Sequence, residues 1–230
     1  MKFNLIISDP AYSFEDKLTM NSTKRGAVSQ YKSVMSHEDI INIKIKDIAA
    51  DNAIMALWVP SSLLDIGLKA LENYGFAHKQ TFIWVKSKNE PLLKLKKQIK
   101  KAFTNNKDEQ EILDLIDNFD LNDTMKFYMG RIFRQTHEIA LIGTRGKTSN
   151  DRLDKSQISI FIGENPKHSE KPHILHDRLE KMYPTYKNKL ELFAREPYKD
   201  WVTCGNELKG ESEYIYNGDL RDSIEILKDL

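Results

Sequence analysis

The segment Asp9-Pro10-Ala11-Tyr12 contains the residue types best suited to chemistry in this sequence. It follows the apolar run 3–7, which predicts a buried strand, and the carboxyl ends of parallel strands form the ligand crevice of open α/β sheets. The Asp9 carboxylate and the Pro10 carbonyl offer two neighbouring acceptors, and proline has no N–H to compete for them. The ring of Tyr12 could lie flat on a base. The segment therefore predicts a site that accepts the two hydrogens of an exocyclic amino group.

The elements that must position this segment alternate between short apolar runs and longer stretches of helical spacing. This alternation predicts an α/β fold in a single domain, 1–230, with a mainly parallel sheet and helices on both faces. Strands are expected at residues 3–7, 53–59, 77–85, 138–143, 159–162, 189–194 and around 202. Helices are expected at residues 36–48, capped by Ser36 with Asp39, at 63–73 and at 172–184.

Composition excludes several classes of protein. The chain has 230 residues and a formal net charge of +1, so it is neither histone-like nor built on an acidic tail. A single cysteine, Cys204, cannot form an intramolecular disulfide or a cysteine-rich zinc site. No run approaches eighteen apolar residues, and the apolar start is cut at Asp9. We expect a cytoplasmic protein without membrane contact.

Residues 88–125 have the charge pattern of an insertion. Residues 86–107 contain eight lysines and one acid, whereas residues 108–123 contain seven acids and no base. Apolar residues recur at helical spacing in both halves, which predicts a helical hairpin that turns near Asn105 and Asn106. Its two helices could simply neutralise each other, or the lysine helix could contact phosphates. A homodimer or partner subunit could also dock on this insertion.

The sequence as a whole resembles the N6-adenine methyltransferases related to the catalytic subunit of the mRNA N6-adenosine methyltransferase, particularly their bacterial and phage DNA-modifying branch. The resemblance covers nearly the whole chain outside the insertion, and one departure is Ala11, where the family usually has a second proline. It implies a Rossmann-like S-adenosylmethionine-dependent methyltransferase fold. Beyond residues 9–12, the segments that carry it are 24–26, 31–40, 56–59, 74–76, 84–86, 134–138, 143–146, 168–172, 190–195, Trp201 and 205–207.

The resemblance implies roles for individual residues. Asp9, Pro10 and Tyr12 would be catalytic. The methyl donor would be bound by Lys171 at its methionine carboxylate, by Arg195, Asn206 and Glu207 near its ribose hydroxyls, and by Asp219 and Leu220 at its adenine. The substrate-binding residues are predicted to be Lys24, Arg25, Tyr31, Arg145 and Lys147, although cations of this kind are individually more typical of a solvated surface.

The tail, residues 211–230, predicts a circular permutation. In related amino-methyltransferases a short strand, a Gly-Asp pair and a helix often precede the catalytic strand, whereas here this pattern, 214–220, stands at the opposite end of the chain. Joining Leu230 to Met1 would restore the relatives' order, which requires the two termini to lie close together. The tail would then complete the cofactor site. In the simpler alternative it is a helix packed on the sheet, with Asp219 as its N-cap.

The function predicted from these features is N6-methylation of adenine in DNA. RNA methylation is the nearest alternative, and a catalytically silent nucleic-acid-binding subunit is the rival from another class, although a silent subunit would have no reason to keep Asp9. No metal is expected, because His168, His173 and His176 are accompanied by neither cysteine nor an HExxH motif. The segment 146–148 does not belong to a phosphate loop, since Leu141 stands where the first glycine is required.

Overall fold

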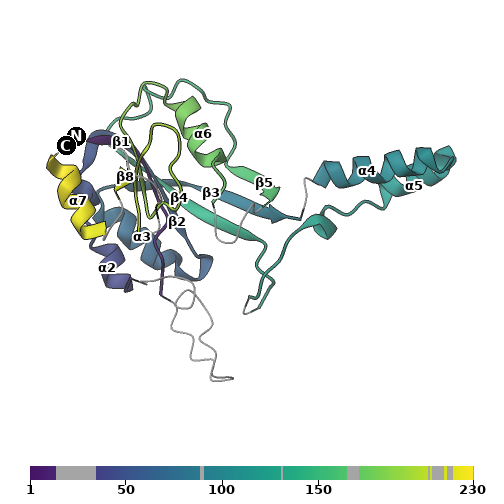
Figure 1. Cartoon of the computed structure of the whole chain (residues 1–230), viewed down its shortest axis with the longest axis horizontal. Coiled ribbons are helices and arrows are strands. Elements are labelled where there is room, and N and C mark those ends of the chain that lie inside the picture. Colours follow the sequence, from purple (N-terminus) through teal and green to yellow (C-terminus); the bar gives the residue numbers. More distant parts are fainter. Residues whose placement is uncertain are drawn as a thin grey trace. The chain divides into compact units, whose positions relative to one another are not determined.

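The computed structural model describes residues 1–13, 35–88, 91–130, 132–164, 171–206, 208, 215–216 and 220–229. The chain, expected to form a single domain, divides into two compact units. Unit 1 comprises Met1–Phe82, Ile139–Gln157 and His173–Leu230, and unit 2 comprises Ile83–Glu138 and Ile158–Pro172. Figure 1 shows the elements of both units along the sequence.

The sheet of unit 1 has the strand order of a doubly wound fold. Its strands lie in the order β3-β4-β2-β1-β6-β7-β8. β1 pairs in parallel with β2 and β6, β6 with β7, and β7 with β8, whereas β4 is antiparallel to β2. If β6 is counted as the first strand, then β7, β8, β1 and β2 are the second to fifth. The spatial order β8-β7-β6-β1-β2 then reads 3-2-1-4-5, which is the doubly wound order expected of a circularly permuted domain. The bounds are β1 Phe3–Ser8, β2 Ala49–Val59, β3 Ala77–Ser87, β4 His137–Arg145, β6 Lys189–Leu192, β7 Val202–Cys204 and β8 Ile215–Tyr216.

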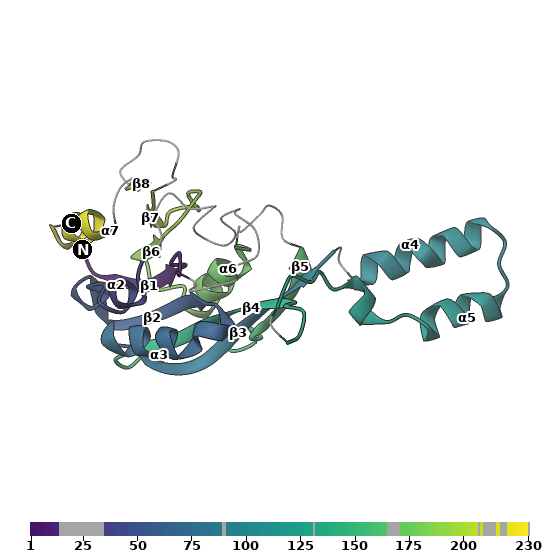
Figure 2. The same ribbon diagram turned by 90° about the horizontal axis from the view of Figure 1, so that it is seen from below.

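Helices cover both faces of this sheet. On one face, Gly67 of α3 lies against Val59 and Leu141. On the other face, the guanidinium of Arg178 of α6 lies 5.5 Å from the ring centroid of Phe82, and this ring contacts Trp58. Figure 2 shows α3 and α6 on opposite sides of the strands. The helical elements of unit 1 are α2 His37–Ile41, η1 Ile45–Asp47, η2 Ser61–Leu63, α3 Leu64–Asn73, α6 Ile174–Met182 and α7 Leu220–Asp229.

One helix differs from its predicted extent. Ser36 caps α2 as expected, accepting the N–H of Asp39 at 3.0 Å, but α2 ends at Ile41 instead of Ile48. The chain bends at Asn42 and continues as the single turn η1. Ile40 and Ile45, one on each side of the bend, are both fully buried. Burial of both isoleucines therefore stabilises the bend. Apolar spacing alone predicts a continuous helix here, because it does not distinguish a straight helix from two short helical turns that bury the same residues.

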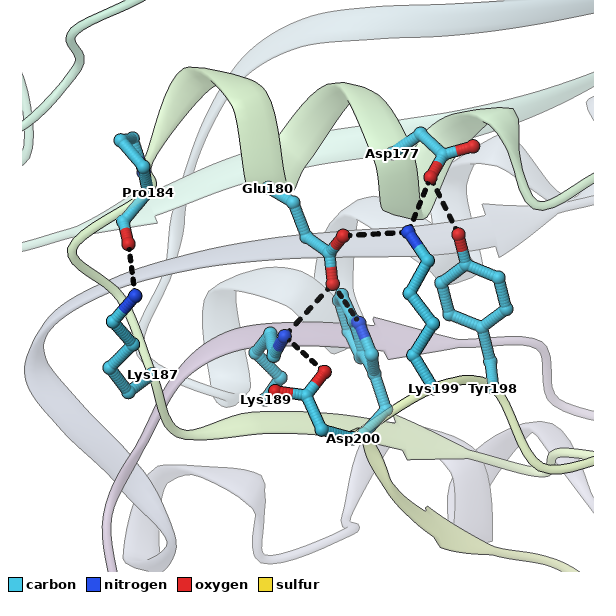
Figure 3. Close-up of polar contacts among 9 residues, drawn as sticks. Asp177, Glu180, Pro184, Lys187, Lys189, Tyr198, Lys199 and Asp200 are labelled. Atoms are coloured by element: carbon cyan, nitrogen blue, oxygen red, sulfur yellow. Dashed lines mark hydrogen bonds and ion pairs between the residues drawn. The ribbon is translucent and has the colours of Figure 1, made fainter.

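β1 forms the centre of the core, as a near-continuous apolar run predicts for a strand covered on both faces. Phe3, Leu5 and Ile6 have no exposed surface. The α6 face is held further by a network that Figure 3 shows, in which Glu180 accepts from Lys189 at 2.9 Å and from Lys199 at 3.0 Å. The indole N–H of Trp201 donates to the same carboxylate at 2.9 Å. These contacts fix the segment that follows β6.

The two ends of the chain lie side by side, as both Figure 1 and Figure 2 show. The Lys2 ammonium donates to the backbone carbonyl of Asp47. On α7, Lys228 lies 3.4 Å from the carboxylate of the same aspartate. The proximity that a circular permutation requires is therefore present.

Unit 2 consists of a two-stranded parallel ladder, a helical hairpin and a β-hairpin. The second part of β3 pairs with β5, Ile160–Glu164, in parallel. α4, Pro91–Thr104, and α5, Glu109–Asp117, form the helical hairpin, with Asn106 at a positive φ of 53° in the turn. Asp108 and Glu111 form a reciprocal capping box at the start of α5, and η3, Leu121–Thr124, follows. In the part of the chain that the structure describes, no helix is long and apolar enough to cross a membrane.

Candidate active site

Asp9 lies at the topological switch point of the sheet in unit 1. β1 ends at Ser8, and its two parallel neighbours, β2 and β6, pair with it on opposite edges. The N–H of Asp9 donates to the carbonyl of Leu192, the last residue of β6, at 3.3 Å. In open α/β sheets ligands bind outside the carboxyl ends of the strands where the strand order reverses. The sheet therefore places a carboxylate where such a fold binds its ligand.

The Pro10 carbonyl, however, is already engaged by one backbone donor. Tyr12 donates its N–H to this oxygen at 3.0 Å, which closes a tight turn after the strand. The expectation that no backbone donor competes here is therefore wrong. A carbonyl oxygen has two lone pairs, so one acceptor position remains beside the half-buried Asp9.

Tyr12 is buried, and its hydroxyl donates to the carbonyl of Trp58 at 3.1 Å. Burial raises the pKa of the Tyr12 hydroxyl above its ordinary value, with further contributions from Tyr74 and Asp9. The side chain thus ties the turn after β1 to the neighbouring strand β2. Its predicted stacking on a target base stays a prediction, which requires the ring to become accessible.

The turn after β6 is held by a close backbone approach. Phe193 adopts a positive φ of 64°, and the N–H of Ala194 donates to the carbonyl of Cys204 at 2.9 Å. A Cβ on Gly205 would lie 2.0 Å from the carbonyl oxygen of Ala194, so only glycine fits. Arg195 and Asn206 follow these positions directly. The structure thus brings Asp9, Arg195 and Asn206 to the carboxyl ends of three adjacent strands.

Unit 2 contains a second cluster of charged residues, centred on Glu138. Its carboxylate lies 3.2 Å from the Lys171 ammonium and also pairs with Lys86. The ammonium of Lys86 lies 4.9 Å from the ring centroid of Trp84 and 4.6 Å from that of Tyr128. Burial would raise the pKa of Glu138, but Lys171 and Lys86 outweigh it and hold the pKa below its ordinary value. The carboxylate is therefore ionised near neutral pH.

This cluster adds two residues to the sequence-based candidates. Lys171 is predicted from its motif, whereas the sequence indicates only a strand start for Glu138 and only a strand end for Lys86. Glu138 is the second residue of β4, which begins at His137. The sequence signal for Glu138 is its place directly after segment 125–137, which contains several cations and no acidic residue.

Arg145 and Lys147 are placed away from the switch point. Arg145 pairs with Ala53 near the start of β2, whereas Ser8, next to Asp9, pairs with Leu57. The guanidinium of Arg145 donates to the Lys46 carbonyl at 2.9 Å, and the Lys147 N–H donates to Asn52 Oδ1 at 2.9 Å. Both residues support a turn at the opposite end of the sheet, so the structure does not bring them together with Asp9.

Several predicted residues lie outside the described part of the chain. These are Lys24, Arg25, Tyr31, Glu207 and Asp219. Leu220 begins α7. His173 and His176 lie beside Tyr198, and His176 Nε2 is 2.9 Å from Glu191. Among the described residues, no group of three acidic, histidine or cysteine side chains could hold a metal ion.

The sequence profile of the MT-A70 family matches residues 3–115 and 111–207 of the chain. The chain belongs to the MT-A70 family. This family comprises adenine N6-methyltransferases, so the resemblance predicted from the motifs is confirmed. The tail after residue 207 lies outside the MT-A70 match.

Individual MT-A70 relatives are distant. The chain is 22% identical to "Type II methyltransferase M.MunI" of Mycoplasma sp over 221 residues, which are 90% of this chain and 78% of that protein. It is also 22% identical to "N(6)-adenosine-methyltransferase MT-A70-like" of Arabidopsis thaliana, over 90% of this chain and 24% of the relative. The human "N(6)-adenosine-methyltransferase catalytic subunit METTL3" is 22% identical over 91% of this chain and 29% of its own length. The chain therefore spans most of the bacterial relative and less than a third of these two eukaryotic ones.

Proposed function

We propose that this MT-A70 protein transfers a methyl group from S-adenosylmethionine to the N6 amine of adenine in DNA. The observation that carries the proposal is the position of Asp9 and Pro10, at the end of the central strand β1 and beside the end of β6. A carboxylate and a carbonyl at this position can accept both hydrogens of one amino group. Neither acceptor suits a phosphate or a carboxylate substrate, because both would repel an anion.

The reaction needs the amine to become a better nucleophile, since its lone pair is delocalised into the adenine ring. Hydrogen bonds from N6 to the Asp9 carboxylate and to the remaining lone pair of the Pro10 oxygen favour a pyramidal nitrogen. N6 then forms a bond to the methyl carbon while the bond from that carbon to sulfur breaks, with its electron pair staying on sulfur. Asp9 stabilises the positive charge that appears on N6, and the proton leaves N6 after transfer.

The residues at the strand ends have suitable chemistry for the methyl donor. S-adenosylmethionine supplies a methyl carbon attached to a positively charged sulfur. The Ser8 hydroxyl is fully buried beside Asp9 and has no hydrogen-bond partner in the described part of the chain, and such a group gains from a polar ligand. Arg195 and Asn206 would bind the ribose hydroxyls, and the role of Lys171 at the methionine carboxylate rests on the family resemblance. The tail with Asp219 and Leu220 would bind the donor's adenine.

DNA is the favoured substrate because the chain spans 78% of M.MunI, whose name describes a type II methyltransferase. RNA is the second candidate, supported by the similarity to METTL3. In either acid the target adenine must leave its stack to reach Asp9. Cytoplasmic location fits an enzyme that acts on bacterial or phage DNA.

The test is transfer of labelled methyl to duplex DNA, single-stranded DNA and RNA by the wild type and by Asp9→Asn. We expect 6-methyladenine in duplex DNA and at least ~100-fold less of it with Asp9→Asn, because the variant loses the charge that stabilises N6. Donor affinity, measured by calorimetry, should change little. Asp65→Asn, an exposed carboxylate on α3, is the matched control and should retain full activity.

Three outcomes would contradict the proposal. Full transfer by Asp9→Asn would remove the mechanism. A wild type that binds neither the donor nor any nucleic acid would favour the silent-subunit alternative, whereas preferential transfer to RNA would replace DNA as the substrate.

A further inference from the structure

A short β-hairpin in unit 2 has a tightly folded tip. Tyr128 and Gln135 form an antiparallel pair through two hydrogen bonds, of 2.9 and 3.1 Å. Between them, a Cβ on Gly130 would lie 2.0 Å from the Phe133 carbonyl oxygen, so the turn admits only glycine there. We call the described residues Phe127–Gly130 and Ile132–Arg134 the aromatic hairpin. The main-chain hydrogen bonds between Tyr128 and Gln135 close its base.

The aromatic hairpin exposes large apolar side chains to an extent unusual for a folded protein. Phe127 is 58% exposed, Met129 83%, Ile132 89% and Phe133 85%. Single exposed apolar side chains are normal on protein surfaces, but four of them within seven positions of the chain indicate an interaction site. A binding partner must therefore offer this tip an apolar surface.

Cations surround the base of the same hairpin. Lys88 and Arg134 lie 5.8 and 6.0 Å from the ring centroid of Phe127, and Lys126 lies 5.7 Å from that of Tyr128. The sequence has no acidic residue from Met125 to His137. The cations favour a partner with an anionic exterior, and the exposed apolar side chains favour one with apolar surfaces beneath that exterior. Nucleic acid has this combination, with phosphates outside and stacked bases within.

We propose that the aromatic hairpin binds the nucleic-acid substrate by inserting Ile132 and Phe133 between bases, while Lys126 and Arg134 contact the phosphates. This proposal rests on the proposed function. Apolar wedges of these residue types are known to enter base steps and to unstack them. Unstacking costs a few kcal/mol per step, and the inserted side chains offset it by taking the place of the lost stacking. An enzyme that must extract an adenine from its stack needs such a device.

The test compares the double variant Ile132→Ser/Phe133→Ser with the wild type. Leu92→Ser is the matched control, because Leu92 is 75% exposed on α4 of the same unit. The probe is a labelled 30-base-pair duplex with 2-aminopurine at several adenine positions, and the readouts are affinity by fluorescence anisotropy and the 2-aminopurine emission. All replaced side chains are exposed, so thermal unfolding followed by circular dichroism should match the wild type.

We expect wild-type binding to raise the 2-aminopurine emission. The double variant should bind at least about tenfold more weakly, as expected when base stacking is lost, and should not raise the emission. Leu92→Ser should remain within twofold of the wild type. A double variant that binds and unstacks the duplex like the wild type would overturn the wedge.

Two other partners have their own signatures, and either would overturn the proposal. If the double variant leaves duplex affinity unchanged but alters the oligomeric state by light scattering, the tip is a contact between copies of this chain. If it leaves duplex affinity unchanged but abolishes binding to phosphatidylserine vesicles, the tip contacts a membrane. Failure of the wedge leaves Asp9-dependent transfer intact, whereas a wild type that binds no nucleic acid removes both proposals.

Discussion

The switch point in unit 1 and the aromatic hairpin in unit 2 expose opposite kinds of residue. At the switch point a carboxylate stands at the end of a largely buried strand, next to a buried proline and a buried tyrosine. At the aromatic hairpin the large apolar side chains are exposed to solvent, and main-chain hydrogen bonds between Tyr128 and Gln135 close its base. Chemistry requires a charged group that cannot move, which a packed sheet provides. Recognition requires accessible apolar surface, which a small hairpin provides.

The same contrast appears in how the two units are stabilised. In unit 1 the strands β1, β2 and β6 bury nearly all their side chains, and the polar groups on the α6 face are paired around Glu180. In unit 2 the helical hairpin buries only Ala102 and depends on surface features such as the Asp108 capping box and the Lys107–Glu111 pair. Exposed pairs of this kind contribute little to stability, because solvent screens the two charges. Unit 1 should therefore carry most of the stability.

Hydrogen exchange tests this difference most strongly. Amides of Leu5–Ile7 in β1 should exchange only through global opening, whereas amides of α4 and α5 should exchange through local fraying. With a global free energy of about 5–15 kcal/mol, protection in β1 should exceed that in α5 by ~10³-fold or more. Mass spectrometry of peptides from the two regions measures it directly. Equal protection would show that the helical hairpin unfolds together with the sheet, and the contrast would disappear.

The next prediction concerns whether the tail belongs to the packed core of unit 1. Leu227 of α7 has no exposed surface, whereas its neighbour Ile226 is 50% exposed. Leu227→Ala should lower the free energy of unfolding by about 2–5 kcal/mol, because it leaves a cavity. Ile226→Ala, the matched control, should change it by less than ~0.5 kcal/mol. Urea denaturation followed by tryptophan fluorescence measures both, and similar small effects would make the tail an accessory helix.

The smallest effect concerns the charged cluster of unit 2. Lys86→Ala removes one of the two cations that lower the pKa of Glu138, so burial should raise this pKa relative to the wild type. Because the wild-type pKa is lowered, ionised Glu138 contributes stability above the ordinary carboxyl pKa, and this contribution is lost as pH falls through the folded-state pKa. The variant should lose it at a higher pH. Carbon NMR titration of the Glu138 carboxyl group measures this change in pKa. Lys107→Ala is the control and should leave the Glu138 pKa unaltered. An unchanged Glu138 pKa in Lys86→Ala would contradict the pairing of Glu138 with Lys86.

Sequence reasoning was most successful where a segment's own pattern determines its structure. The continuous apolar run of β1, the cap at Ser36 and the helical spacing of α4 and α5 each predict an element that the structure contains. Strands were expected at 138–143, 159–162 and 189–194, and β4, β5 and β6 lie there. The Asp9 turn was located because it directly follows such a strand. Its position at the ligand crevice is predicted because the carboxyl ends of parallel strands form that crevice.

What the sequence did not reveal depends on partners that are distant in the chain. Glu138 meets Lys86 and Lys171 only after folding, and no local pattern links the three residues. Arg145 is predicted to bind the substrate, but the antiparallel register of β4 carries it to the far end of the sheet. The aromatic hairpin has neither helical nor strand periodicity, so it gave no signal of secondary structure. Its composition alone could have drawn attention to it.

The permuted strand order has a consequence for synthesis on the ribosome. β1 is the first strand to emerge, and β2, its partner on one side, follows within about fifty residues. β6, its partner on the other side, begins only at Lys189. At ~5–20 residues per second, roughly 10 to 35 s pass between the synthesis of β1 and that of β6. Only then can β6 pair with the second edge of β1. Throughout that interval the edge that later flanks Asp9 is open to pairing with other chains, so slower growth at low temperature, with chaperones in excess, should raise the yield of folded protein.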